Sequence, residues 1–468
     1  MAQPSKIILV FCDGTGLDGV LGSLTVTYSG VSAGGVARKT CYQCTTSIPA
    51  LDNIFAVART VKQYREAKKD KNGAVVAPRI PQIVLYQSGV GSQTGFEPQT
   101  AIDHALSGGA GEEYNKALGH FVDIPGGSRI TVRRIPSSSD ILRLRGAYTA
   151  RKVAGLIDRI GILSGPDLYK LSEKLLDKGD IPGHTPVKVK CVGVWDTVGS
   201  IKRVQVTLGN PVVTVLDAFS ICDATLPDNV EHAYHAVSLQ ENRSNFLPTL
   251  WKDIKKPAQV LEQVWFLGDH GDVGGGHQNL DLSDISLVWM AEKIREFVDL
   301  DTKILDYYID RSRRAGWGES QPNNAFLSLP RSVRLPLFVT QKRDRLWTDR
   351  QDVLAHPSCG KAVDPIRDYE ILRPKRDLKG FSTPDPATLK GFEEKLHKKW
   401  KAKSMPAIKP DISEDATAIG LDKAKRGASN FLDGEIVDGA IQVADGVLEI
   451  GMGLVGEAAS GVSNFFSG

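Results

Sequence analysis

Carboxylate and imidazole side chains come within three residues after the end of three apolar segments of this chain. They are Asp13 after residues 6–11, Asp196 after 187–195 and His270 after 263–267. A second carboxylate, Asp272, stands two positions beyond the histidine. An imidazole can take the proton of a hydroxyl nucleophile when a carboxylate orients its ring. The same residue types can also bind a metal ion that activates water. The chemistry that these residues suggest is therefore hydrolysis.

The elements that position these residues alternate between strands and helices. Short apolar runs predict buried strands at residues 6–11, 82–87, 129–132, 187–195 and 263–267. Apolar residues at helical spacing predict helices at 51–64, 112–122, 145–163 and 284–297. This alternation predicts an α/β fold with a mainly parallel sheet flanked by helices. Since ligands bind at the carboxyl ends of parallel strands, the polar residues stand where a site is expected.

The composition excludes several classes of protein and partner. Of the 468 residues, 41% are hydrophobic and 24% charged, as in an ordinary globular protein. Because 58 Lys and Arg residues balance 55 Asp and Glu residues to a net charge of +3, we expect no nucleic-acid partner. The sequence shows no secretory signal and no apolar run of about 18 residues, which predicts a cytoplasmic protein without a transmembrane helix. Cys41 and Cys44 lack further ligands at zinc-like spacing, so we expect no metal and no cofactor.

Six stretches of the sequence resemble one known family. In the family's order they are 11–15 (FCDGT), 89–91 (GVG), 145–156 (RGAYTARKVAGL), 193–200 (GVWDTVGS), 232–251 (HAYHAVSLQENRSNFLPTLW) and 264–277 (VWFLGDHGDVGGGH). This family comprises the phospholipase effectors delivered by type VI secretion and has bacterial and fungal members. The resemblance implies an α/β-hydrolase-like domain in which a Ser-Asp-His triad cleaves ester bonds. The implied partner is a lipid or another acyl ester.

The chain divides into three predicted regions. Residues 1–300 are expected to form the catalytic domain, 301–410 an accessory or lid region, and 411–468 a flexible Gly/Ala-rich tail. Apolar residues of the tail keep roughly helical spacing among acidic ones, whereas helices that lie on membranes usually present Lys or Arg. We therefore favour a loosely ordered or self-packing tail over a peripheral membrane contact. The sequence gives no indication of the oligomeric state.

The resemblance also suggests roles for individual residues. In α/β hydrolases the triad occurs in the chain order nucleophile, acid, base. Asp196 and His270 fit the acid and the base in this order, and Asp272 is an alternative acid. An aspartate after a strand often only caps a helix or a turn, and a histidine can simply pack. We favour the catalytic roles for Asp196 and His270, and structural roles for His232 and His235.

An oxyanion hole would use backbone N–H groups of two turns. One turn follows the first predicted strand and the other precedes the helix predicted at 145–163. The residues concerned are Asp13, Gly14, Thr15, Arg145 and Gly146.

The nucleophile is missing from the sequence. The family pattern before this helix is Gly-Phe-Ser-Arg-Gly-Ala, a nucleophile elbow, where this chain has Leu-Arg-Leu-Arg-Gly-Ala at residues 142–147. Leu144 therefore stands at the serine position and Leu142 at the first glycine. Loss of a triad serine costs on the order of 10⁶-fold in rate. The serines at 137–139 are poor substitutes because no glycine-bounded turn holds them.

Three interpretations remain open. The chain can be an acyl-ester hydrolase whose gene model is faulty at 133–144, a pseudo-hydrolase that binds ligand without cleaving it, or a metal-assisted phosphohydrolase. The third would use Asp13, Asp196, His270 and Asp272, and it ranks last because Phe11 stands where aspartyl phosphatases carry their nucleophilic aspartate. Residues 20–48 are a second doubtful insert, since long structureless loops inside a compact domain are uncommon.

The faulty-gene-model hypothesis predicts a transcript that differs from the printed sequence. The codons TTC-TTC-GGC-TTC, preceded by A and read one nucleotide early, give Ile-Leu-Arg-Leu, which is the sequence of 141–144. We expect the transcript to encode Gly-Phe-Ser directly before Arg145, with the serine adjacent to that arginine. Sequencing of the messenger RNA tests this, and a message that encodes 133–144 as printed rejects the hypothesis.

Overall fold

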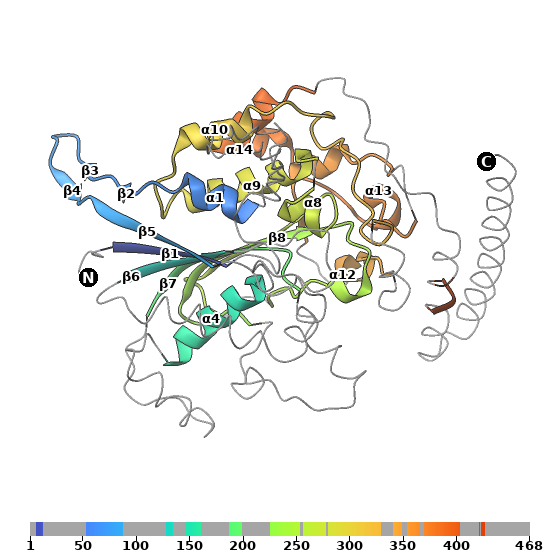
Figure 1. Ribbon diagram of the computed structural model, residues 1–468, viewed down its shortest axis with the longest axis horizontal. Coiled ribbons are helices and arrows are strands. Elements are labelled where there is room, and N and C mark those ends of the chain that lie inside the picture. The colour runs from blue at the N-terminus through green and yellow to red at the C-terminus, as the bar shows by residue number, and fades with distance from the viewer. Residues whose placement is uncertain are drawn as a thin grey trace, which may run out of the picture.

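Figure 1 shows the protein as a computed structural model. The structure describes residues 6–12, 53–87, 128–133, 146–160, 187–198, 225–252, 256–277, 279–328, 340–348, 353–365, 369–402, 421 and 423–425. The following description concerns these residues.

A mainly parallel sheet forms the centre of the fold. Its order is β10-β9-β8-β7-β6-β1-β5-β2, and every neighbouring pair is parallel except β5 with β2. The strands are β1 (Lys6–Cys12), β2 (Tyr64–Arg65), β5 (Ile80–Gln87), β6 (Ser128–Arg133), β7 (Val189–Trp195), β8 (Val230–Ser238), β9 (Val260–Phe266) and β10 (Leu354–Ala355). A separate hairpin joins β3 (Lys68–Lys69) and β4 (Val75–Ala77). The prediction of an α/β fold with a parallel sheet flanked by helices is confirmed.

Helices cover both faces of this sheet (Figure 1). On one face lie α1 (Asn53–Thr60), α8 (His270–Gly274), α9 (Asp281–Ile294), α10 (Thr302–Ile309) and α14 (Gly391–Lys399), and on the other lies α4 (Gly146–Ile160). The short helices α12 (Asp344–Thr348) and α13 (Pro374–Asp377) and the 3-10 turns η1 (Ser244–Phe246), η2 (Pro357–Lys361) and η3 (Pro386–Thr388) complete the described elements.

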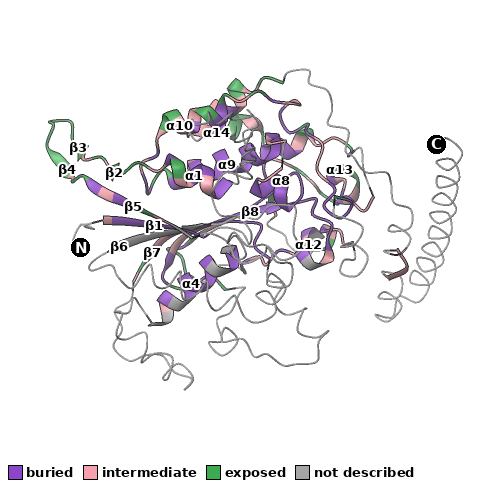
Figure 2. Cartoon of the chain, viewed as in Figure 1, coloured by how far each residue is buried: buried purple, intermediate pink, exposed green. Residues whose placement is uncertain are grey.

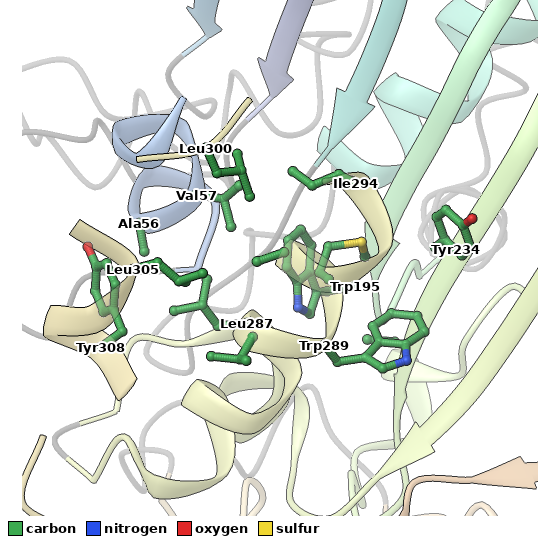
Figure 3. Close-up of a cluster of buried hydrophobic side chains, with 14 of the residues drawn as sticks. Ala56, Val57, Trp195, Tyr234, Leu287, Trp289, Ile294, Leu300, Leu305 and Tyr308 are labelled. Carbon is green, nitrogen blue, oxygen red and sulfur yellow. The ribbon is translucent and has the colours of Figure 1, made fainter. Parts of the chain in front are cut away.

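Two hydrophobic cores lie on opposite faces of the sheet. Alternate residues of β1 point to opposite faces, so Leu9 packs in the core with α1 and α9 while Val10 packs in the core with α4. Figure 2 shows the buried residues concentrated where the helices meet the sheet. Figure 3 shows the first core, in which Trp195 of β7 and Leu287 of α9 lie among aromatic and aliphatic side chains.

The region beyond residue 300 contributes to the same sheet and core. Leu305 of α10 and Leu396 of α14 are buried in the core that contains α1 and α9. β10 extends the sheet beside β9. The described part of 301–402 therefore packs directly on the sheet and its helices.

Some of the predicted elements differ from the structure, and others lie outside the described residues. The helix predicted at 51–64 is α1 and ends at Thr60, because Lys62 then bonds to Asp299 and β2 pairs with β5. β8 was not predicted, although its burial is nearly complete. Four predicted segments lie outside the described residues: the insert 20–48, the helix at 112–122, residues 134–144 and the tail, of which only 421 and 423–425 are described. Among described residues, no helix is long and apolar enough to cross a membrane.

Gly268, between β9 and α8, occupies a position that only glycine fits. Its φ is 101°, and an added Cβ would overlap the side chain of Asp272. Gly380 has a φ of 72° with nothing within 4 Å of an added Cβ. We expect Gly380→Ala to cost about 1–2 kcal/mol of unfolding free energy from backbone strain, and Gly268→Ala to cost about 1–3 kcal/mol more from overlap. Urea unfolding measures both, and equal losses would contradict the assignment.

Candidate active site

The structure joins the two residues that the sequence predicts as acid and base. Asp196 follows β7 directly, and His270 is the first residue of α8, after β9. The Nδ1 atom of His270 lies 2.5 Å from Oδ2 of Asp196. Both side chains are fully buried. The contact spans 74 positions in the sequence and forms because both residues follow parallel strands at the same edge of the sheet.

Asp196 sits in a tight turn with a dense set of hydrogen bonds. Its φ of 37° is in the left-handed region, which a residue other than glycine adopts at a cost. Its backbone N–H donates to the carbonyl of Ala236 at 2.7 Å, and its Oδ1 accepts from the backbone N–H of Ser238 at 3.0 Å. The guanidinium of Arg343 donates to Oδ1 at 2.6 Å and to Oδ2 at 3.0 Å.

These contacts keep the Asp196 carboxylate ionised. Burial acts to raise its pKa, but the charge of Arg343 and the hydrogen bond from His270 outweigh burial and hold the pKa well below its usual range. An ionised carboxylate on Nδ1 of His270 fixes the tautomer in which Nδ1 carries the proton and Nε2 has the free lone pair.

The other side of the His270 ring is ready to accept a proton. Burial lowers the pKa of His270, partly offset by Asp196, so the ring is neutral near pH 7. Phe246 packs edge-on against the ring, with centroids 5.3 Å apart. Nε2 is buried and has no hydrogen-bond partner among the described residues. A buried polar atom without a partner is costly and marks a position where another group is expected.

Asp272, the alternative acid, has different contacts. It completes a capping box with Asp269 at the start of α8: the Asp272 N–H donates to Asp269 Oδ1 at 2.7 Å, and the Asp269 N–H donates to Asp272 Oδ2 at 3.1 Å. Asn323 donates to both carboxylates. The geometry pairs His270 with Asp196 instead, and Asp272 holds the helix that carries His270.

His277 joins the same cluster. Its Nε2 lies 2.9 Å from Asp269 Oδ1, and Asp269, Asp272 and His277 each offer one atom within 4.8 Å of the others, a spacing that a cation would need. The hydrogen bonds already described use these atoms, and they account for the group as a cap for α8. Burial and the neighbouring Asp269 raise the pKa of Asp272 to about 7, and Asp269 raises that of His277 to about 9 against the effect of burial.

The remaining predicted residues fall into two groups. Gly146 is the first residue of α4, while Asp13, Gly14, Thr15, Arg145 and Leu144 lie outside the described residues.

His235 and His232 have surroundings that fit a structural role. The buried His235 accepts from the N–H of Thr197 at 3.0 Å, and burial lowers its pKa to about 3. His232 packs against Phe297, with ring centroids 4.7 Å apart.

Sequence reasoning missed Arg343. It placed Glu241 and Arg243 in a polar network beside His232 and His235, and it missed their contact with His270. Arg343 stands in no motif that we recognised, and it reaches Asp196 across 147 positions. The guanidinium of Arg243 forms two hydrogen bonds of 2.8 Å to Glu241, and the Arg243 N–H forms a third of 2.9 Å. The N–H of His270 also donates to Glu241, at 3.3 Å. The local spacing of Glu241 and Arg243 was visible in the sequence, but their burial was not.

The His277–Asp269 pair predicts a pH dependence of stability. Since the pKa of His277 is raised from 6.5 to about 9 on folding, its contribution is fully present below pH 6.5 and is lost as pH rises to 9. We expect urea unfolding of the wild type to show a loss on the order of 3 kcal/mol over this range. His277→Gln should remove most of this loss, whereas His397→Gln on α14 should leave it. A wild-type stability that is flat from pH 6.5 to 9 would contradict the pairing.

Comparison with known proteins identifies the family. The family model described as the catalytic domain of Tle1-like phospholipase effectors of type VI secretion (T6SS) matches residues 6–180 and 173–293. No curated protein and no solved structure gave a match. The matched segments contain β1 to β9, Asp196 and His270. The resemblance in the sequence is thereby confirmed, and the chain belongs to the family of Tle1-like phospholipase effector catalytic domains.

Proposed function

We propose that this chain carries the acid–base half of a serine-esterase site for lipid or other acyl esters. The observation that carries the proposal is the buried Asp196–His270 pair, whose Nε2 atom has no partner among the described residues. A family of phospholipase catalytic domains makes a lipid the natural substrate class. In this scheme Asp196 orients His270, and His270 exchanges the proton of the nucleophile.

The sheet topology supports an α/β-hydrolase-like arrangement. From β1 the chain moves to β5 on one side, and then β6 to β10 follow in order on the other side. The order therefore reverses between β1 and β6, and ligands bind at such switch points. The proposed oxyanion residues after β1 (Asp13, Gly14, Thr15) and at the start of α4 (Arg145 directly before it, Gly146 as its first residue) follow these two strands in the chain.

The proposed reaction requires a hydroxyl on the segment between β6 and α4. The hydroxyl oxygen would attack the ester carbonyl while His270 Nε2 takes its proton, and the protonated ring would then give that proton to the leaving alcohol. Water would release the acyl group by the same path in reverse. Leu144 offers no such oxygen, so the printed chain would bind an ester without forming an acyl-enzyme.

Metal-assisted phosphohydrolysis finds less support in this geometry. Arg343 donates to both oxygens of Asp196, and His270 takes a further position on Oδ2. A cation at Asp196 would compete with a fixed guanidinium for the same oxygens. We therefore keep the ester hydrolase as the proposal and use a chelator as a control.

Restoring the elbow tests the proposal. Leu142→Gly with Leu144→Ser recreates the G-x-S-x-G pattern before α4. We expect the double variant to hydrolyse p-nitrophenyl butyrate at least about 10²-fold faster than the printed chain, because a triad serine is worth on the order of 10⁶-fold in rate. The variant should also become labelled by a fluorophosphonate, and EDTA should not change its rate.

Two matched variants control this experiment. Leu142→Gly with Leu144→Ala tests the loop change without a hydroxyl and should stay inactive. Adding His270→Gln to the active variant should abolish the gain. A folded double variant without activity or labelling would reject the proposal. Hydrolysis by the printed chain at the rate of the double variant would show that Leu144 does not occupy the nucleophile position.

A further inference from the structure

Arg343 is a buried cation that no part of the predicted triad requires. It stands directly before α12 and is 1% exposed. Besides its two bonds to Asp196, its Nη1 donates to the carbonyl oxygen of Ser238 at 2.6 Å and lies 2.7 Å from the Ser238 hydroxyl. Its Nη2 also donates to the carbonyl of Phe246. A planar guanidinium that makes contacts on both edges is held in one orientation.

The segment that carries Arg343 lies beyond the part of the chain that matches the family model, which ends at residue 293. This segment is fastened to the site by other contacts. The N–H of Gln341 donates to the carbonyl of Asn242 at 2.9 Å, and Trp347 packs edge-on against Trp265 of β9, with centroids 6.2 Å apart. Residues 340–348 are therefore built against the ends of β8 and β9.

The two hydrogen bonds from Arg343 determine the orientation of the Asp196 carboxylate. Oδ2 of Asp196 is shared between Nη2 of Arg343 and Nδ1 of His270, while Oδ1 faces Nη1 and the N–H of Ser238. The two bonds from Arg343, one to each oxygen, thus fix the plane of the carboxylate that His270 contacts. Without Arg343, Asp196 would be a buried negative charge that receives hydrogen bonds only from neutral groups, the His270 ring and the N–H of Ser238, which is strongly unfavourable.

We propose that Arg343 is the positioning residue of the Asp196–His270 pair, and that the catalytic unit therefore extends past the matched domain to include residues 340–348. The proposal deepens the proposed function and rests on it. Arg343 balances the carboxylate charge, so the pair as a whole does not take up an extra proton and Nε2 stays free. Among the described residues, the other charged groups that act on His270 are Glu241 and Arg243, which pair with each other.

The experiment compares Arg343→Met, Arg343→Lys and the control Arg345→Met in the full chain. The readout is the pH titration of the His270 Cε1–H signal by NMR, which does not depend on a nucleophile. In Arg343→Met the pair keeps a net negative charge, so we expect His270 to titrate at least about one pH unit higher, a tenfold change in proton affinity. Arg343→Lys should restore most of the wild-type titration, and Arg345→Met, on the exposed side of α12, should not alter it.

A fourth variant decides the case in which Arg343→Met does not fold. Asp196→Asn with Arg343→Met removes both charges. If the double variant folds while Arg343→Met alone does not, the proposal is supported, because the single variant then fails to fold on account of the unpaired charge of Asp196. Failure of both to fold, or folded Arg343→Met with an unchanged His270 titration, overturns it. A shifted His270 titration together with an inactive Leu142→Gly, Leu144→Ser variant would refute the proposed function and leave the role of Arg343 standing.

Discussion

The site depends on how one buried carboxylate is satisfied. Asp196 is fully buried, and a carboxylate there must receive hydrogen bonds on both oxygens to remain charged. The donors come from three separate segments: Ser238 at the end of β8, His270 on α8, and Arg343 before α12. The ends of β7, β8 and β9 must therefore lie in register for the carboxylate to be tolerated. Because the buried Asp196 carboxylate must receive these hydrogen bonds, the His270 ring that donates one of them is held in one position.

The short helix α8 is the second half of this arrangement. Gly268 turns the chain after β9, Asp269 and Asp272 cap the helix, and Asn53 of α1 donates to the carbonyl of Val273 at 3.1 Å. The same Asn53 amide also donates to α9, at the carbonyl of Ser283. His270 thus stands on an element that is tied at its start by the capping box and at its end by two other helices. Such support from outside the reacting pair is what keeps a catalytic geometry fixed.

The sequence could predict the strands and helices that follow from local patterns of apolar residues. It could not predict the side chains that meet only through contacts between distant parts of the chain. The apolar runs identified β1, β7 and β9, and the polar residues after them placed Asp196 and His270 at one edge of a parallel sheet. The strand β8 was not predicted, because His232, Tyr234 and His235 interrupt its apolar pattern. The contact of Arg343 with Asp196 was not predicted either. An isolated arginine in a charged region gives no periodic or spacing signal, and only the folded structure buries it beside Asp196. Chain order already favoured Asp196 over Asp272, and the structure adds that His270 contacts Asp196 while Asp272 caps α8.

This member of the family joins a buried aspartate to a buried histidine, and we propose that they are the acid and the base of an esterase site whose nucleophile position holds Leu144. The central claim is that Asp196 fixes the His270 ring with Nδ1 protonated and Nε2 free. The ¹⁵N chemical shifts of the His270 ring in the labelled full chain at pH 7 measure this directly. The account predicts a protonated Nδ1 and an unprotonated Nε2, with a change on Asp196→Asn. A proton on Nε2, or a ring whose shifts ignore Asp196→Asn, would contradict it.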